Sequence, residues 1–425
     1  MGGQARTSKP GRSKQHKAGP IMQRSERYMT ANYPRHPIAI ASGKGCRLID
    51  ADGRSYLDLF AGFGAGILGH CHEDLVTAGT KQMNKLWHVG NLLHTEPQTL
   101  LAEHVATKGF GGRSYFCHSG SDANEAAFKL ARLHGKANPG EARGGRYKTI
   151  ATDNSFHGRG FAAMQATGGE KVREGFDPPL AGFTHVPYND LKAMREAIDE
   201  ETVAIIVEPI QGEGGVHVPD DGYLPGLRKL ADEHDLVLIF DEVWTGCGRT
   251  GRYFGYQHWD AEPDVMTLGK AVGCGLAVGV ACVSDRLSGY FDAKRMGRVT
   301  HATTLGGNCV SMAVAARLFE VLERDGLVER AQRAGERIKG RLRKFAAKHP
   351  IVDVRGRGLF LGVELDATNE GSWFDSGAAV VNRCMEEGLM VNATQGDVIR
   401  LAPPLTISDE EIDEGLDILE EVIAG

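Results

Sequence analysis

The stretch Leu236-Val-Leu-Ile-Phe-Asp241-Glu242-Val-Trp-Thr-Gly246 decides the fold class of this 425-residue chain. Its first five residues are apolar without polar alternation, which predicts a strand buried on both faces, as in a parallel sheet. The strand ends abruptly in Asp241-Glu242, and open α/β folds bind their ligands at this carboxyl edge of the sheet. The stretch therefore predicts an α/β domain with a ligand site beside Asp241, although a simple strand-terminal cap would give the same pattern.

Apolar runs separated by helical patterns continue on both sides of this strand. Strands are predicted at 114–117, 149–152, 203–208 and 277–283, and helices at 121–134, 190–199 and 222–233. This alternation is typical of a large, mainly parallel sheet that helices cover on both faces. We therefore assign residues 76–309 to a large α/β domain.

A different pattern follows residue 308 and predicts a smaller α+β domain at 310–425. Helices are predicted at 310–325, 327–348 and 376–387, and strands at 352–354, 358–364 and 398–401. Ser408 and Glu411 form a capping box that begins a last helix. Nearer the N-terminus, an alternating pattern around Asp52-Gly53 predicts a hairpin. Residues 31–75 are expected to pack with the small domain.

The N-terminal segment has a composition of its own. Its first twenty residues carry five Lys/Arg, no acidic residue and almost no large apolar side chain. Such a segment cannot bury a core. Residues 1–30 are therefore predicted to form a disordered basic tail. A transit peptide would be similar in composition, but it needs an amphipathic apolar face that is missing here.

The composition of the whole chain is typical of a soluble globular enzyme, with 41% hydrophobic and 24% charged residues. The formal charge of −6 excludes an overall basic field for binding nucleic acid or anionic membranes. No apolar run approaches the roughly 18 residues of a membrane-spanning helix. The eight cysteines are scattered without a C-x-x-C pair, so we predict no metal site, free thiols and a cytoplasmic location.

Lys270 stands between a short apolar run and a glycine cluster, in Met-Thr-Leu-Gly-Lys270-Ala-Val-Gly-Cys-Gly. Most lysines are solvated, but one flanked by small and apolar residues is expected to be partly buried. Burial lowers the pKa of an amine, and so favours the neutral nucleophile that Schiff-base formation needs. Lys270 is therefore a candidate catalytic lysine.

Two further segments complete a set of groups around Asp241 and Lys270. Ser119-Gly120-Ser121 leads from a strand directly into a helix, which is typical of a phosphate site and also of a plain helix cap. Phe156 stands in an aromatic–His–Gly–Arg run that ends at Arg159, just past another strand. A phosphate cradle, a flat aromatic ring, an acid at a strand end and a buried lysine are what pyridoxal 5′-phosphate (PLP) needs. The sequence therefore predicts PLP as the cofactor.

From about Tyr33 to the C-terminus, the sequence resembles the class III (subgroup II) aminotransferases of PLP fold type I, and most closely the acetylornithine/succinylornithine aminotransferases. Seven motifs carry the resemblance: CHSGSDANEAAFKLAR, NSFHGR, EPIQGEGGV, DEVWTGCGRTG, MTLGKAVG, TTLGGN and NATQGDVIRLAPPL. The resemblance implies a large, mainly parallel-sheet cofactor domain and a smaller α+β domain.

The resemblance also implies how the cofactor is held. Lys270 would form the Schiff base with PLP and then act as general acid and base, while Asp241 would pair with the pyridinium nitrogen. Phe156 and Val243 would press on the two faces of the ring. The remaining cofactor contacts would come from Ser119, Gly120, Ser121, Trp244 and Thr304. Thr304 would reach across from a partner subunit, which implies a homodimer with a shared active site.

Substrate-binding residues follow from the same resemblance. Arg400 would bind the α-carboxylate of glutamate, and Glu213 would neutralise Arg400 when the other substrate is present. Such a switch lets one pocket take two substrates without leaving a buried charge unpaired. Arg159 would bind the carboxylate far from the reacting amine, and Thr303 is a further candidate. A turn cap at Glu213 and a surface strand position for Arg400 are the alternative.

Two positions depart from the family pattern. Trp244 stands where close relatives of acetylornithine aminotransferase carry a glutamine that approaches the phenolic oxygen of the cofactor. Leu93-His94 replaces an aromatic pair whose tyrosine lines the substrate pocket. Bulk is therefore added on one side of the predicted pocket, and a hydroxyl is lost on the other.

The leading prediction is transamination of an ω-amino group from an acetylornithine-like or ornithine-like donor to 2-oxoglutarate, giving glutamate and a semialdehyde. Other ω-amino donors (4-aminobutyrate, putrescine or a β-amino acid) stay open, as does a glutamate-semialdehyde-type aminomutase. Glu213 and Arg400 together favour the two-substrate reaction over the mutase. The Lys270–Asp241 pair disfavours a non-catalytic binding module, and the lack of a strand–GxGxxG–helix unit disfavours a Rossmann dehydrogenase.

Overall fold

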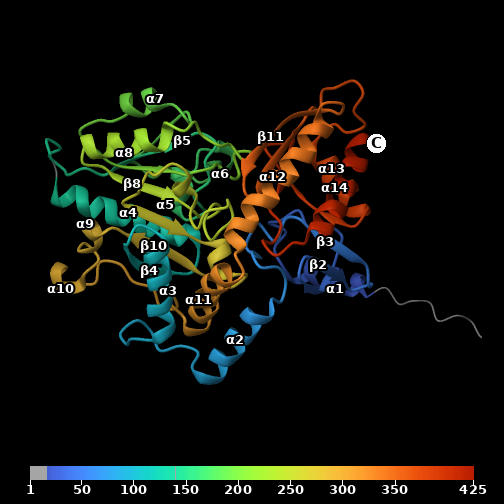
Figure 1. Cartoon of the computed structure of the whole chain (residues 1–425). Coiled ribbons are helices and arrows are strands. Elements are labelled where there is room, and N and C mark those ends of the chain that lie inside the picture. The colour runs from blue at the N-terminus through green and yellow to red at the C-terminus, as the bar shows by residue number, and fades with distance from the viewer. Residues whose placement is uncertain (1–16, 139) are drawn as a thin grey trace, which may run out of the picture.

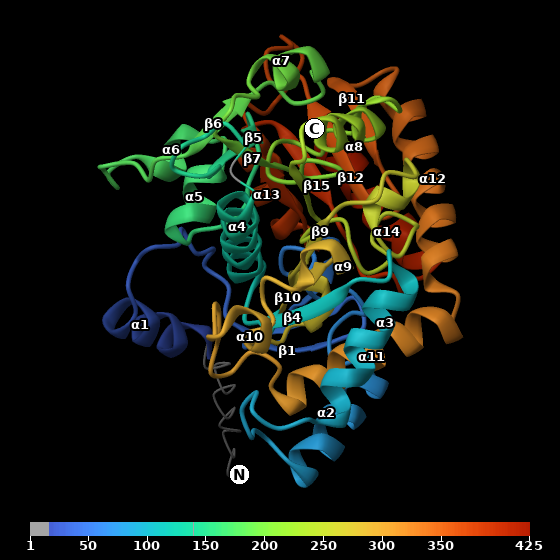
Figure 2. The same cartoon turned by 90° about the vertical axis from the view of Figure 1, so that its left-hand side faces the viewer.

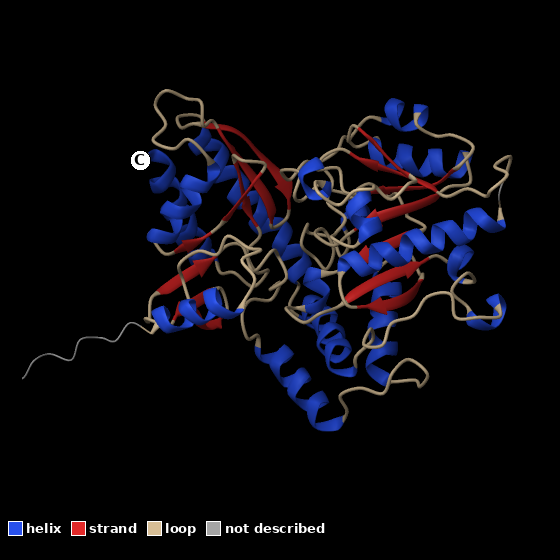
Figure 3. Cartoon of the chain, turned by 180° about the vertical axis from the view of Figure 1, so that it is seen from behind, coloured by secondary structure: helices blue, strands red, loops and turns tan. Residues whose placement is uncertain are grey.

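The computed structural model describes residues 17–138 and 140–425, which form a large and a small lobe (Figure 1). The large lobe has one sheet and the small lobe another, a third sheet includes strands of the N-terminal segment, and Figure 3 shows the two lobes from behind. The predicted combination of a large, mainly parallel α/β domain with a smaller α+β domain is confirmed. Among the described residues, no helix is long and apolar enough to cross a membrane.

The large sheet has seven strands in the order β4-β10-β9-β8-β7-β5-β6. Their bounds are Arg113–Cys117 (β4), Lys148–Thr152 (β5), Phe183–Val186 (β6), Thr202–Val207 (β7), Val237–Asp241 (β8), Val265–Leu268 (β9) and Gly279–Val283 (β10). Strands β6, β5, β7, β8 and β9 pair in parallel, whereas β10 is antiparallel to β9 and β4. The connection from β9 to β10 is too short for the crossover that a parallel pair requires. The strands predicted from the sequence do not include β6 and β9, because each has only four residues, too few to show a periodic pattern of apolar side chains.

Helix α4 (Gly120–Ala137) shows how the local sequence builds the large lobe. Its N-cap is Ser119, whose Oγ accepts the backbone N–H of Asp122 at 3.2 Å. Its alanine-rich face is buried in a cluster with residues of β7 to β10. The other helices of this lobe are α5 (Phe161–Ala166), α6 (Glu170–Arg173), α7 (Leu191–Glu196), α8 (Tyr223–Glu233), α9 (Asp285–Ser288) and α10 (Ala293–Met296), with 3₁₀ turns η1 (Gly255–His258) and η2 (Lys270–Gly273).

Three further helices, α2 (Glu73–Lys85), α3 (Glu96–Lys108) and α11 (Cys309–Arg324), gather at one end of the large lobe (Figures 1 and 2). Helix α11 packs against both α2 and α3. The sequence assigned this helix to the small domain because its long amphipathic pattern resembles that of the next helix. The structure places it with the large lobe instead.

The small lobe has an antiparallel sheet in the order β11-β12-β15-β14, whose strands are Ile351–Arg357 (β11), Phe360–Leu365 (β12), Asn392–Thr394 (β14) and Val398–Leu401 (β15). Its helices are α12 (Leu327–Ala346), α13 (Gly377–Glu386) and α14 (Asp409–Ala424). The predicted capping box begins α14: Ser408 Oγ accepts the Glu411 N–H at 3.1 Å, and Glu411 Oε2 accepts the Ser408 N–H at 3.0 Å.

The N-terminal segment joins the small lobe through a second sheet, β1-β2-β3-β13. Its elements are helix α1 (Ala18–Tyr28) and strands Ile40–Lys44 (β1), Arg47–Asp50 (β2), Ser55–Asp58 (β3) and Leu389–Met390 (β13). The predicted hairpin is β2–β3, and β3 pairs in parallel with β13 of the small lobe. The disordered-tail prediction is wrong for residues 18–28, where Ala18, Ile21 and Met22 share one face of a helix. Residues 1–16 of that predicted tail lie outside the described residues.

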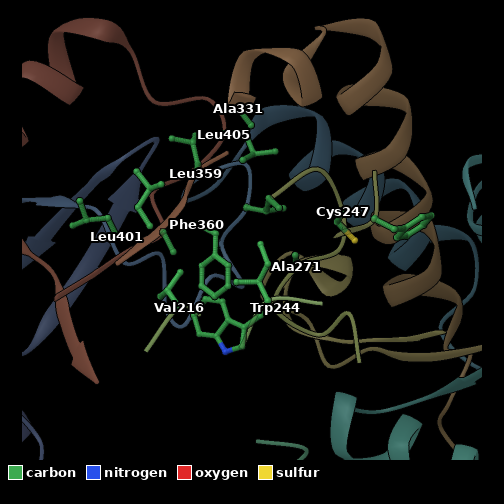
Figure 4. Packing of buried hydrophobic residues seen from close by; sticks show 14 of the residues in the cluster. Val216, Trp244, Cys247, Ala271, Ala331, Leu359, Phe360, Leu401 and Leu405 are labelled. Atoms are coloured by element: carbon green, nitrogen blue, oxygen red, sulfur yellow. The ribbon is translucent and has the colours of Figure 1, made fainter. Parts of the chain in front are cut away.

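The two lobes share one continuous core at their junction (Figure 4). Arg249 is fully buried there. Its guanidinium donates to the carbonyl oxygens of Gly64 (3.4 Å), Leu359 (3.1 Å) and Pro403. These three carbonyls come from the N-terminal segment and from two parts of the small lobe. The junction is therefore packed and hydrogen-bonded, which fixes the residues that face each other across it.

Candidate active site

Asp241 ends β8 at the carboxyl edge of the large sheet, and its side chain is buried. Its Oδ2 accepts a hydrogen bond from Asn124 Nδ2 at 2.7 Å and lies 2.8 Å from Nδ1 of His157. Its Oδ1 accepts the backbone N–H of Val243 at 3.0 Å. Contacts from three separate segments therefore hold this carboxylate in one orientation.

Lys270 begins the turn directly after β9, next to the strand that ends in Asp241. Its φ of 44° lies in the left-handed region, which non-glycine residues seldom adopt outside constrained sites. Burial lowers the pKa of Lys270 to about 8, opposed by the carboxylate of Glu213 and reinforced by the guanidinium of Arg400. The amine is therefore closer to its neutral, nucleophilic form than an ordinary lysine.

Ser119-Gly120-Ser121 forms the start of α4. Backbone N–H groups in the first turn of a helix have no partner within the helix and favour an anion. A Cβ on Gly120 would lie 2.4 Å from Cγ2 of Val243, so the close approach of these segments requires glycine. Ser121 Oγ accepts the backbone N–H of Arg159 (3.3 Å) and of Gly160 (3.1 Å). The helix start is thus tied to the loop that carries Phe156.

A cavity of about 310 Å³ lies between these segments. The predicted site residues that line it are Ser119, Gly120, Ser121, Phe156, Arg159, Asp241, Val243 and Lys270. His118, His157, Gly158, Leu276, Ala277 and Val278 complete its lining. The structure therefore brings the catalytic pair and most of the predicted cofactor residues into one cavity.

The backbone of Phe156 is anchored by a buried carboxylate. Its N–H donates to Glu208 Oε1 at 3.0 Å, and the other carboxylate oxygen of Glu208 accepts the N–H of Gly212 at 2.9 Å. Burial raises the pKa of Glu208 to about 7. Glu208 therefore links the loop of Phe156 to the loop of Glu213.

Glu213 and Arg400 form an ion pair at the junction of the lobes, with Arg400 Nη1 3.0 Å from Glu213 Oε1. Arg400 is fully buried, and its Nη2 donates to Asn392 Oδ1 at 2.8 Å, so a surface position for Arg400 is wrong. Burial acts to raise the pKa of Glu213, but Arg400 and Lys270 outweigh it and the pKa is lowered. Among the described residues, Nε of Arg400 finds no hydrogen-bond acceptor, so it can serve a ligand carboxylate together with Nη1 once Glu213 leaves.

Trp244 contacts both Lys270 and this ion pair. Its Nε1 donates to Glu213 Oε1 at 3.1 Å. The centre of its ring system lies 4.2 Å from Lys270 Nζ and 4.3 Å from Arg400 Cζ. Trp244, predicted to bind the cofactor, therefore contacts the lysine and the ion pair and does not line the cavity.

Thr303 and Thr304 lie on the loop before α11, outside the cavity of their own chain. Thr303 Oγ1 is 2.9 Å from Nε2 of His118, which does line the cavity. Thr304 is exposed. Leu93 and His94 are also exposed and outside the cavity.

Three residues that hold the site were not singled out from the sequence. Asn124 and His157 contact Asp241, and Glu208 supports the Phe156 loop. Asn124 stands three positions after Ser121, which puts the two on one face of α4, and Thr267 donates to its Oδ1 at 2.7 Å. The helical spacing was the available signal for Asn124, whereas the roles of His157 and Glu208 depend on contacts between distant segments.

The residues of the cavity fit PLP. A helix start with open N–H groups suits its phosphate, Lys270 suits its aldehyde, and the fixed carboxylate of Asp241 suits a protonated pyridine nitrogen. A Cβ on Gly158 would lie 2.4 Å from Ser121 Oγ, so glycine is required where the loop closes on the helix start. The shape of this phosphate site therefore depends on the lack of a Cβ at Gly158 as well as on the hydrogen-bond donors present.

The comparisons with known proteins agree with this geometry. The model of the class-III aminotransferases matches residues 28–423. This chain belongs to the class-III aminotransferases. It is 41% identical to the acetylornithine aminotransferase of Caldanaerobacter subterraneus subsp. tengcongensis, over 94% of this chain and 98% of that protein. It is 40% identical to the succinylornithine transaminase/acetylornithine aminotransferase of Pseudomonas aeruginosa, over 94% and 96%.

A solved structure shares the fold of this class-III aminotransferase. The ornithine aminotransferase from Toxoplasma gondii superposes with a TM-score of 0.89 at 31% identity, covering 96% of this chain and 94% of that one. That structure has partial occupancy of PLP at its active site. The predicted family, fold, enzyme class and cofactor are therefore confirmed: the protein is a PLP-dependent aminotransferase.

Proposed function

We propose that this class-III aminotransferase transfers the ω-amino group of an acetylornithine-like or ornithine-like donor to 2-oxoglutarate, giving glutamate and a semialdehyde. The names of its relatives, which cover acetylornithine, succinylornithine and ornithine, support this donor class. The observation that carries the proposal is the buried Glu213–Arg400 pair beside Lys270.

The large lobe supplies the chemistry common to both half-reactions. Bound PLP provides an electron sink for the substrate carbanion. Lys270 Nζ, with its lowered pKa, can accept and return a proton beside the reacting carbon. Asp241, held by Asn124 and His157, provides a fixed negative charge for the ring nitrogen. Phe156 and Val243 line the cavity and would contact the faces of the ring.

The Glu213–Arg400 pair serves the exchange of substrates. An ω-amino donor leaves Glu213 on Arg400, so the guanidinium keeps its counter-charge. Glutamate or 2-oxoglutarate brings a carboxylate that replaces Glu213 on Nη1 of Arg400 and can also use the open Nε donor. Arg159, which lines the cavity from its exposed side, would bind the second carboxylate.

We also propose a homodimer in the cytoplasm. Thr303 and Thr304 lie outside the cavity of their own chain, and Thr304 is exposed, which suits a contact with the active site of a partner subunit. All eight cysteines are free thiols, which suits a reducing compartment.

A panel of amino donors with 2-oxoglutarate as acceptor tests the proposed reaction, with glutamate formation as the measurement. We expect the highest kcat/KM for acylated or free ornithine. A higher kcat/KM for 4-aminobutyrate, putrescine or a β-amino acid would contradict the proposed donor class. If the enzyme isomerises glutamate semialdehyde without an acceptor, its reaction is that of an aminomutase rather than a transaminase.

A further inference from the structure

Trp244, which departs from the family pattern, is held rigidly in the core. Its side chain is 4% exposed and stacks on Phe360, with ring centres 5.0 Å apart and planes at 11° (Figure 4). A Cβ on Gly64 would lie 2.6 Å from Cζ3 of the indole, and one on Gly212 would lie 2.5 Å from Cδ1. Two glycines therefore make room for the indole, and the packing around it leaves it no other position.

The fixed indole touches both members of the Glu213–Arg400 pair. Its Nε1 donates to Oε1 of Glu213, the same oxygen that Arg400 Nη1 approaches. Its face lies 4.3 Å from the guanidinium carbon of Arg400, within the range of a cation–π contact. One side chain thus fixes the carboxylate through its edge and the guanidinium through its face.

We propose that Trp244 is a specificity-determining residue that holds Glu213 on Arg400 and so selects against ligands whose carboxylate must displace Glu213. This inference rests on the proposed use of the pair in the reaction. Opening the pair breaks the indole hydrogen bond, because the packed indole cannot follow a carboxylate that leaves Arg400. An ω-amino donor leaves the pair closed and meets no such penalty. Trp244 acts here as a positioning residue, through Glu213.

Trp244→Phe in the holoenzyme tests this role, because phenylalanine keeps a stacking aromatic ring and removes the N–H donor together with part of the indole. The probe is glutarate, a dicarboxylate without an amino or keto group, and its Kd is measured by calorimetry. A net hydrogen bond is worth about 0.5–1.5 kcal/mol, so we expect glutarate to bind roughly two- to tenfold more tightly to the variant. The Kd of glutarate should therefore fall relative to the KM for the ω-amino donor, which does not have to displace Glu213.

Trp373→Phe is the matched control, since its Nε1 also donates a hydrogen bond, at 2.6 Å to the carbonyl of Val422. It should leave the Kd of glutarate unchanged. A merely structural role for Trp244 would weaken the binding of glutarate and the donor alike. If the Kd of glutarate in Trp244→Phe is unchanged or higher than in the parent enzyme, the proposal is overturned.

Arg400→Ala separates this inference from the proposed function. If glutarate binding depends on Arg400 but not on the N–H of Trp244, only the role of Trp244 fails. If glutarate does not bind, or binds equally well to Arg400→Ala, the proposed carboxylate site fails and the role of Trp244 fails with it.

Discussion

The cofactor side of the active site, around Asp241 and Lys270, is built from strand ends and one helix start of the large lobe. The carboxylate side, around Glu213 and Arg400, joins the large lobe to a strand of the small lobe. On the first side, Asn124, His157 and a backbone N–H hold the carboxylate of Asp241 in place. On the second side, the opposite charges of Glu213 and Arg400 form an ion pair at the junction of the lobes.

This difference follows from what each side must do. The cofactor is the same in both half-reactions, so its partners can be fixed once by the sheet and by α4. The substrates alternate, so the carboxylate side needs a pair that can separate, and the buried Arg400 keeps a counter-charge when a ligand carboxylate replaces Glu213. The departure at Trp244 lies on the second side, where substrates differ.

The strongest test of the cofactor side is Lys270→Ala. Turnover should fall by at least about 10²–10⁴-fold, because this lysine is both the attachment point and the proton carrier. Steady-state glutamate formation measures the loss, and Lys192→Ala, at a side chain 84% exposed, is the matched control. Normal turnover in Lys270→Ala would refute its catalytic role.

Arg400→Ala tests the carboxylate side. We expect the KM for 2-oxoglutarate to rise roughly 10- to 100-fold, since a charge-assisted hydrogen bond is worth about 1.5–3 kcal/mol. The variant leaves the half-buried Glu213 without its partner, so the melting temperature should be measured alongside. The double variant Glu213→Gln with Arg400→Ala should regain the melting temperature of the parent enzyme, but its KM for 2-oxoglutarate should stay as high as in Arg400→Ala. If the KM for 2-oxoglutarate is unchanged, a residue other than Arg400 binds its carboxylate.

A smaller effect is expected in the pH dependence of the lysine itself. Because burial lowers the pKa of Lys270 to about 8, its neutral form increases as the pH rises through 8 rather than through about 10.4. Acetylation of the cofactor-free protein, followed residue by residue with mass spectrometry, should therefore show a midpoint near pH 8 for Lys270. Lys192, whose side chain is 84% exposed, is the matched control in the same samples. A midpoint of 10 or higher for Lys270 would mean that the cavity does not lower its pKa.

Much of the site could be predicted because its signals are local. The apolar run before Asp241, the Ser-Gly-Ser start of α4 and the glycines around Lys270 are each read within a few residues. Helix α1 was missed because a basic composition outweighed the short apolar face of Ala18, Ile21 and Met22. The contact of Glu208 with the Phe156 loop could not be read from either segment alone.

The sequence by itself determined the order of strands and helices, the strand-end carboxylate and the lysine, because side-chain periodicity and turn chemistry act over neighbouring residues. Only the tertiary structure decided that the indole of Trp244 contacts both Lys270 and the Glu213–Arg400 pair. It also decided that Asn124 and His157 hold Asp241, and that α11 packs with the large lobe. Such contacts join residues far apart in the chain, and they form only when the packing of the whole fold offsets the entropy of closing the loops between them.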